Sequence, residues 1–187
     1  MFKKCKLAPL VLIIPERHHD QRGFFSEFYN RKEYRDQGID IEFVQDNFSF
    51  SKEIGTLRGL HFQAPPNAQA KLVRCARGAI FDVAVDIRSG SPTYGQWEGY
   101  ELTSNNGNQL YIPIGFAHGF ITLEPNSEVA YKCSNFYSPK DEGTVFWNDA
   151  EIGIDWSFKY NPLLSTKDAS APILKELKNP FIYGVNS

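Results

Sequence analysis

The sequence is poor in helical patterning, in cysteine and in net charge, and each shortage narrows the possible classes of protein. Helical patterning is weak and confined to residues 31–37 and 173–178, so helices are expected to be a minor part of the fold. The three cysteines, Cys5, Cys75 and Cys133, are widely spaced and form no CxxC pair. Their number and spacing predict neither a disulfide framework nor a zinc site. Free cysteines are typical of a reducing compartment, so we expect a cytoplasmic protein. A formal net charge of −2 gives no indication of a nucleic-acid partner.

Long hydrophobic runs are also missing. A basic start is followed by a short apolar run over residues 10–14, which has the outline of a secretory signal peptide. However, Pro9 precedes the run and no small-residue cleavage site follows Ile14. The run is far too short to span a membrane, so no membrane partner is expected. We interpret residues 10–14 as the first strand, and a secreted protein is the alternative. The run is too hydrophobic for a free edge strand, so we expect it to be exchanged or packed in a dimer.

Aromatic residues are abundant, with fifteen Phe, nine Tyr and three Trp. This enrichment favours β structure or an aromatic-lined pocket. Hydrophobic residues make up 42% of the 187 residues, which is enough for a substantial core. No internal repeat or linker interrupts the chain, so we expect a single domain over residues 1–187.

A two-residue period dominates the chain and is clearest over residues 71–88. In the second half of this segment apolar side chains alternate with a more polar set that includes Asp82 and Asp86. The "ARG" between the halves predicts a hairpin turn at Gly78. Further strands are expected at residues 99–103, 108–112, 119–122 and 129–135. Short strands separated by turn clusters are typical of a β-sandwich or barrel.

Alternate side chains of a small barrel face its interior, where one ligand can bind. Three polar residues share a face with small or apolar neighbours: His61, Lys71 and Tyr131. A buried lysine is costly unless its charge is needed, so the three together predict a polar site inside the barrel. The alternative is that these strands have wet faces and Lys71 points to solvent.

Arg58 does not share parity with His61 in the stretch "GTLRGLHFQ". Gly59, which lies between them, would permit a bulge that brings both side chains to one side. Without a bulge, Arg58 would lie on the opposite face or at the rim, and the pattern alone does not decide between the two.

Six blocks, in order, resemble one known family: "GFFSEFYN", "VQDNFSFS", "LRGLHFQAPPNAQAKLVRCARGAIFDVAVDIRSGSPTYGQW", "YIPIGFAHGF", "AYKCSNFYSPKDEG" and "IGIDW". They are similar to the dTDP-4-dehydrorhamnose 3,5-epimerases of deoxysugar biosynthesis, and the resemblance covers about residues 15–168. It implies a mainly β, cupin-type jelly-roll barrel with short N- and C-terminal helical segments. It also implies a cytoplasmic homodimer that binds a dTDP-sugar, uses no metal or other cofactor and feeds the synthesis of cell-surface polysaccharides.

The resemblance further implies a role for each matched residue. His61 would be the general base, Asp168 its orienting carboxylate, Tyr131 the acid and Lys71 the group that stabilises the enolate. Tyr137 would stack on the thymine ring. Residues near Arg22 would reach into the partner's site. The remaining positions implied to line the nucleotide-sugar site are Arg22, Glu27, Gln45, Asp46, Asn47, Arg58, His118, Glu142 and Lys167.

The chemistry of such an epimerase suits these residue types. Carbons next to a ketone have acidic C–H bonds, and inversion needs one group to remove the proton and another to return it on the opposite face. Neutral histidine, with a reference pKa of about 6.5, suits the base, and tyrosine, at about 10, holds a proton to donate. A fixed positive charge from Lys71 or His118 would stabilise the enolate oxygen. Arginine suits the diphosphate, because its planar fork meets oxygens in pairs.

Other interpretations remain open at this level. Each residue has a structural explanation: His61 as a core histidine, Tyr131 and Tyr137 as strand aromatics, and Asp168 as the cap of the short segment "DASAP". A metal-dependent cupin needs several converging histidines, and the chain has four, of which His18 and His19 are read as a surface turn. A non-catalytic nucleotide-sugar-binding cupin would have no use for His61 together with Tyr131. An epimerase that acts only at C3 or only at C5 would use the same base and acid.

Overall fold

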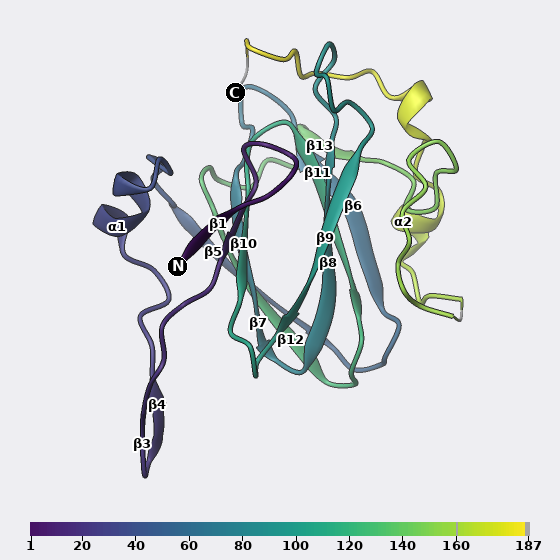
Figure 1. Ribbon diagram of the computed structural model, residues 1–187. Coiled ribbons are helices and arrows are strands. Elements are labelled where there is room, and N and C mark those ends of the chain that lie inside the picture. Colours follow the sequence, from purple (N-terminus) through teal and green to yellow (C-terminus); the bar gives the residue numbers. More distant parts are fainter. Residues whose placement is uncertain (160, 186–187) are drawn as a thin grey trace.

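Residues 1–159 and 161–185 are described by the structure, a computed structural model in which two antiparallel sheets pack face to face (Figure 1). The six-stranded sheet has the order β1 (Phe2–Lys4), β2 (Val11–Ile13), β10 (Gln109–Ile112), β7 (Lys71–Arg77), β12 (Ser127–Cys133) and β5 (Gln45–Ser51). The five-stranded sheet has the order β13 (Glu142–Thr144), β6 (Leu57–Gln63), β11 (Phe116–Thr122), β8 (Ala79–Asp86) and β9 (Trp97–Thr103). The mainly β architecture predicted from the two-residue period is confirmed.

The predicted hairpin over residues 71–88 is wrong. β7 pairs with β10 and β12, whereas β8 pairs with β9 and β11, so the two strands belong to different sheets. Gly78, with φ of +76°, is the corner at which the chain crosses from one sheet to the other. A Cβ there would lie 2.5 Å from Ser127 Oγ, so the corner needs glycine. A hairpin and a sheet-switching corner have the same alternation, and the local pattern therefore does not separate them.

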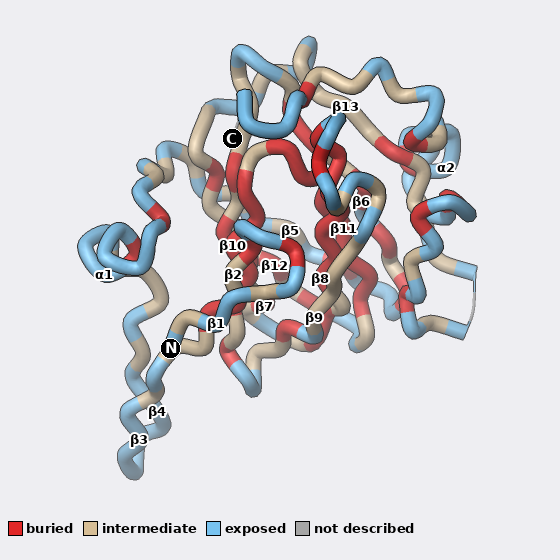
Figure 2. Tube along the Cα trace, turned by 45° about the horizontal axis from the view of Figure 1, so that its top comes forward, coloured by how far each residue is buried: buried red, intermediate tan, exposed pale blue. Residues whose placement is uncertain are grey.

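The core has layers on both sides of the five-stranded sheet (Figure 2). Ile80 and Ala84 of β8 face the space between the sheets, while Val83 and Val85 pack on the outer face against the C-terminal segment. Both faces of β8 are therefore buried. The face of β8 that carries Asp82 is polar in sequence but is not exposed to solvent, because Asp82 is completely buried.

Helices are few and short, as expected. α1 (Arg31–Asp36) begins at Asn30, whose side chain accepts a hydrogen bond from Lys32 N at 3.1 Å, and its Tyr34 packs over the outer face of the six-stranded sheet. A 3₁₀ turn, η1, spans Leu174–Glu176 in the predicted C-terminal segment. α2 (Thr166–Ala169) was not predicted. In the part of the chain that the structure describes, no helix has the length and apolarity to cross a membrane.

The N-terminal region differs from expectation in two ways. Residues 10–14 do not hold the first strand, because β1 precedes β2, and β2 pairs on both sides with β1 and β10 of the same chain rather than lying at a free edge. The two adjacent histidines do not form a turn: they belong to β3 (His18–Asp20), which pairs with β4 (Gly23–Phe25). This hairpin projects away from the barrel in Figure 1 and is exposed along its length in Figure 2.

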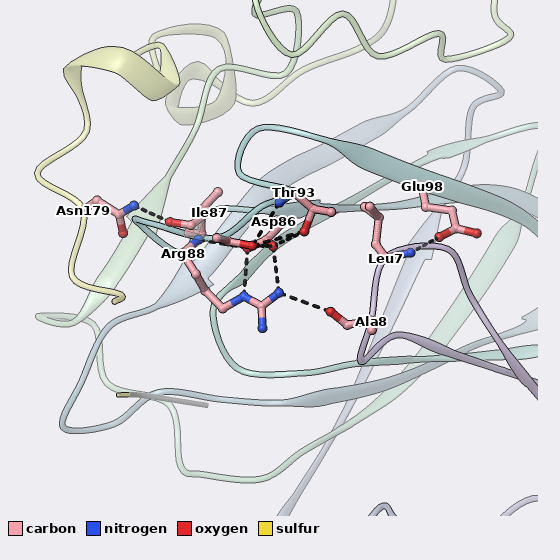
Figure 3. Close-up of polar contacts among 9 residues, drawn as sticks. Leu7, Ala8, Asp86, Ile87, Arg88, Thr93, Glu98 and Asn179 are labelled. Atoms are coloured by element: carbon pink, nitrogen blue, oxygen red, sulfur yellow. Dashed lines mark hydrogen bonds and ion pairs between the residues drawn. The ribbon is translucent and has the colours of Figure 1, made fainter. Parts of the chain in front are cut away.

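Both terminal segments are held at one end of β8 (Figure 3). The buried Arg88 guanidinium donates to both carboxylate oxygens of Asp86, at 2.9 and 2.7 Å, and to the carbonyl of Ala8 at 3.2 Å. Asn179 donates to the carbonyl of Ile87. The end of β8 therefore anchors the N-terminal loop and the C-terminal segment to the barrel.

Candidate active site

A cavity of about 510 Å³ opens between the sheets, beside α2. Many of the residues singled out in the sequence line it. They come from β6, β7, β11, β12 and the region of α2, and they are Arg58, His61, Lys71, His118, Tyr131, Lys167 and Asp168. Segments more than one hundred residues apart in the chain therefore meet at one site.

A bulge in β6 brings Arg58 and His61 to this cavity together. His61 is opposite His118 and Arg58 is opposite Phe120, so two residues of β6 face the single Gly119 of β11. Gly59 has a φ of +141°, and a Cβ there would lie 2.5 Å from the Cα of Gly119. The bulge therefore requires glycine, and it resolves the question of parity that the sequence left open.

Arg58 is held at the mouth of the cavity. Its Nη2 donates to the carbonyl of Phe50 at 3.1 Å and its Nε donates to Ser51 Oγ at 3.3 Å. Both acceptors lie on β5, so the guanidinium connects the two sheets and stays partly exposed.

His61 and Asp168 form a close pair, with 2.6 Å between Nε2 and Oδ1. The Asp168 side chain is 4% exposed and that of His61 is 29% exposed, so the imidazole lies between the carboxylate and the cavity. α2 positions Asp168, whose backbone N–H donates to the capping Ser165 Oγ at 3.1 Å. Burial raises the pKa of Asp168, but hydrogen bonds and the charge of His61 outweigh it, so the pKa lies below its usual range.

A second pair joins His118 to Asp82, with 2.7 Å between Nε2 and Oδ1. Both side chains are buried, and His118 lines the same cavity. Burial lowers the pKa of His118 despite the neighbouring carboxylate, which favours the neutral ring. Sequence reasoning missed Asp82 because it falls in a regular alternation and in none of the positions implied by the resemblance.

Lys71 and Tyr131 approach the cavity from the six-stranded sheet. The Lys71 Nζ lies 6.0 Å from the centre of the Tyr131 ring. Burial lowers the pKa of Lys71 and raises the pKa of Tyr131. His61 comes from the five-stranded sheet, so these two side chains and the imidazole enter the cavity from opposite walls.

Polar residues at the rim form a connected chain of contacts. Glu142 Oε2 pairs with Lys167 Nζ at 2.5 Å and accepts from the Tyr137 hydroxyl at 3.1 Å. The backbone N–H of Tyr137 donates to Gln45 Oε1 at 2.9 Å, and Gln45 donates to Asn47 at 3.0 Å. Tyr137 is 54% exposed.

Seven residues implied by the resemblance do not line this cavity within one chain: Gln45, Asn47, Tyr137 and Glu142 belong to the chain of contacts described above, and Arg22, Glu27 and Asp46 have other surroundings. Arg22 is at the tip of the projecting β3–β4 hairpin, where it pairs with Asp20 at 2.6 Å. Glu27 accepts a hydrogen bond from Asn30 at 3.0 Å beside α1. Asp46 is on the exposed side of β5 and pairs with Lys132 at 2.9 Å. The alternation of β5 directs Asp46 away from the side that Gln45 and Asn47 occupy.

Metal-ligating groups do not converge at this site. Among residues 1–159 and 161–185, no three His, Cys, Asp or Glu side chains gather closely enough to hold a metal ion. His61 and His118 are each engaged by a separate carboxylate.

Comparison with known proteins gives consistent matches over most of the chain. A family model described as dTDP-4-dehydrorhamnose 3,5-epimerase matches residues 4–176. A protein of that name from Salmonella typhimurium is 52% identical over 174 residues, which are 92% of this chain and 94% of the relative. Another from Sinorhizobium fredii is 50% identical over 182 residues, 97% of this chain and 93% of the relative.

Solved structures agree with these matches. The structure of dTDP-6-deoxy-D-glucose-3,5-epimerase RmlC from Legionella pneumophila, in complex with dTDP-4-keto-L-rhamnose, has a TM-score of 0.94 to this chain. Its sequence is 43% identical, and the match covers 98% of each chain. The expected cupin-type fold is confirmed by this likeness.

Proposed function

The chain belongs to the dTDP-4-dehydrorhamnose 3,5-epimerase family, and from this premise we propose that it is an isomerase that inverts C3 and C5 of dTDP-4-keto-6-deoxy-D-glucose to give dTDP-4-keto-L-rhamnose. One observation carries the proposal from the geometry: the His61–Asp168 pair and the Lys71–Tyr131 pair line one cavity from opposite sheets. A sugar ring between these walls has a base on one face and a proton donor on the other.

His61 removes the proton. Asp168 accepts a hydrogen bond from Nε2–H, which orients the ring and leaves Nδ1 to take the proton from carbon. The imidazolium that forms is stabilised by the buried carboxylate. General base assistance of this kind typically accelerates a reaction by about 10²–10⁴-fold.

Tyr131 returns a proton on the opposite face of the ring. Burial raises the pKa of its phenol, so it stays protonated at neutral pH and donates when the carbanion forms. The Lys71 ammonium stabilises the negative charge that develops on the C4 oxygen. Burial lowers its pKa, and the developing oxyanion favours its charged form.

Arg58 and Lys167 bind the diphosphate, because both are cationic and line the cavity mouth. Tyr137 stacks on the thymine ring with its exposed face, while Gln45 and Asn47 offer hydrogen bonds beside it. Glu142 orients Lys167 and Tyr137. His118 forms a hydrogen bond with the C4 oxygen of the sugar or with a neighbouring hydroxyl.

We further propose that the active form is a homodimer in which the β3–β4 hairpin delivers Arg22, and the segment that follows it delivers Glu27, to the partner's site. The hairpin exposes Phe24 at 48% and Phe25 at 70%, a pair of aromatic rings that water solvates poorly. The hairpin projects away from the barrel in Figure 1, which supports a role for Arg22 on another chain. Asp46, on the outer side of β5, lies on a surface that such a partner would cover.

The proposal also covers the domain, the cofactor requirement and the cellular setting of the reaction. Residues 1–187 act as a single cupin-like domain, and the reaction uses no metal or cofactor. The three free cysteines suit a reducing cytoplasm. The product supplies rhamnose for cell-surface polysaccharides, lipopolysaccharide among them.

The direct test is product analysis. Purified enzyme is incubated with dTDP-4-keto-6-deoxy-D-glucose, the product is trapped by reduction of the ketone, and the sugar configuration is read by NMR coupling constants. Inversion at both carbons supports the proposal. Inversion at one carbon identifies a single-carbon epimerase instead, and an unchanged sugar contradicts the proposed activity.

A further inference from the structure

Asp82 is a buried carboxylate that the reaction described above does not use. It lies in the middle of β8 and is completely buried. Its neighbours of the same parity, Ile80 and Ala84, belong to the core between the two sheets. Asp82 therefore points into the barrel interior, where an isolated carboxylate is costly unless its charge has a use.

The hydrogen bonding of Asp82 is incomplete. Its Oδ1 pairs with His118 Nε2 at 2.7 Å, but its buried Oδ2 has no hydrogen-bond partner within the described residues. A purely structural acceptor for one N–H would be served as well by the neutral amide of asparagine. The charge of Asp82 is therefore the feature that needs an explanation.

Lys71 is the cation on which we expect the charge of Asp82 to act. It enters the same interior from β7 of the opposite sheet, with Val73 and Cys75 of the same parity in the inner core. Burial lowers the pKa of Lys71, and the negative charge of Asp82 acts against that effect. The titratable groups that face this lysine come from β8, β11, β12 and β13, and they are Asp82, His118, Tyr131, Cys133 and Glu142.

We propose that Asp82 is a positioning residue of the active site, which fixes the His118 ring through one oxygen and keeps Lys71 protonated through its charge. The two histidine–carboxylate pairs then have different tasks. The His61–Asp168 pair moves the proton, and Asp82 acts on the two groups, His118 and Lys71, that stabilise the enolate oxygen from opposite sheets. This inference rests on the proposed function only for its kinetic consequences.

Asp82→Asn isolates the charge, because the amide oxygen still accepts a hydrogen bond from His118. We expect kcat to fall by about 10- to 100-fold with little change in KM, the range seen when a partner that orients a directly acting group is lost. We also expect the alkaline limb of the kcat–pH profile to move to lower pH, since Lys71 loses its proton more easily. An unchanged kcat or an unchanged alkaline limb overturns the proposal.

Asp149→Asn is the matched control. Asp149 is also buried, and it accepts from Glu151 N at 2.9 Å and Leu174 N at 2.7 Å, but it is not among the residues that line the cavity. Its substitution should lower Tm and leave the kcat per folded molecule and the pH profile as in the wild type. Equal kinetic changes in both variants would make the effect of Asp82 merely structural and overturn the proposal.

Two NMR measurements do not depend on activity. The titration midpoint of Lys71, followed at its 13Cε and assigned with Lys71→Arg, should fall in Asp82→Asn and stay the same in Asp149→Asn. An equal midpoint in Asp82→Asn overturns the proposal. If Asp82→Asn does not fold, the imidazole 15N spectrum of the wild type decides: His118 protonated at Nε2 supports the proposal, and the Nδ1–H tautomer contradicts it.

Discussion

At the scale of the residue, Tyr131 tests whether the acid and the base act separately. Tyr131→Phe keeps the ring that packs against the inner core and removes the hydroxyl. Deprotonation by His61 should continue, whereas protonation on the opposite face should fall by about 10²–10⁴-fold. In heavy water the variant should therefore return deuterated substrate faster than it forms inverted product, as read by NMR and mass spectrometry.

Tyr111→Phe is the control for that change. Tyr111 is buried on the outer face of the six-stranded sheet, away from the cavity. Its variant should keep the wild-type ratio of exchange to inversion. If Tyr131→Phe also keeps this ratio, another group donates the proton.

At the scale of the element, the bulge in β6 is the feature on which the site depends. Gly59→Ala would place a Cβ 2.5 Å from the backbone of Gly119 at a φ of +141°. Positive-φ strain costs about 1–3 kcal/mol, and the clash adds a similar amount by displacing the strands. We expect a loss of about 2–5 kcal/mol in the free energy of unfolding, measured in urea, together with a large loss of activity.

Gly90→Ala separates strain from displacement. Gly90 has a φ of +81°, and a Cβ there would meet nothing within 4 Å. It should lose stability through strain alone and retain activity. Full activity in Gly59→Ala would mean that the bulge does not hold Arg58 and His61 in place.

The strands show how much of the fold and of the site could be predicted from the sequence. Alternation identified the strands and the inward parity of Lys71 and Tyr131, because side-chain direction in a strand is a local property. Pairing is not local, and the same alternation concealed the change of sheet at Gly78. Asp82 was missed for a related reason: its contact with His118 joins residues that lie far apart in the sequence and meet only after folding. The short α2 has too few residues to leave a periodic signal.

At the scale of the whole molecule, the Asp86–Arg88 pair holds the N-terminal loop at Ala8, beside the contact between Ile87 and Asn179 of the C-terminal segment (Figure 3). Arg88→Met leaves the buried Asp86 carboxylate without its cation, which typically costs about 3–5 kcal/mol. Burial raises the pKa of Asp86, but hydrogen bonds from Arg88, Ser91 and Thr93 outweigh it, so the folded-state pKa lies below the unfolded value.

The sign of the pH dependence follows from that direction. A carboxylate with a lowered folded-state pKa contributes stability above its unfolded pKa of about 3.9, and this contribution is lost as the pH falls through the folded-state pKa. Arg88→Met should therefore unfold in acid at a higher pH than the wild type, followed by tryptophan fluorescence. Arg35→Met, at an exposed position of α1, should not shift the acid midpoint; equal midpoints for all three proteins would contradict this account.

Assembly is the second property of the whole molecule. We expect a dimer by light scattering at micromolar concentration, held in part by Phe24 and Phe25 of the projecting hairpin. The double change of both to serine should shift the protein towards the monomer and raise KM, because Arg22 and Glu27 would leave the partner's site. Ile54→Ser, at a similarly exposed apolar residue, is the control. A wild-type monomer under these conditions would contradict the proposed assembly.

The central claim is that His61 removes a proton from carbon, and hydrogen exchange tests it most directly. Wild-type enzyme and His61→Ala are incubated with dTDP-4-keto-6-deoxy-D-glucose in heavy water, and deuterium at C3 and C5 is measured by NMR and mass spectrometry. The account predicts incorporation at both carbons with the wild type and almost none with His61→Ala, since no enolate forms without a base. Near-normal exchange in His61→Ala would contradict the assignment of the base and, with it, the proposed mechanism.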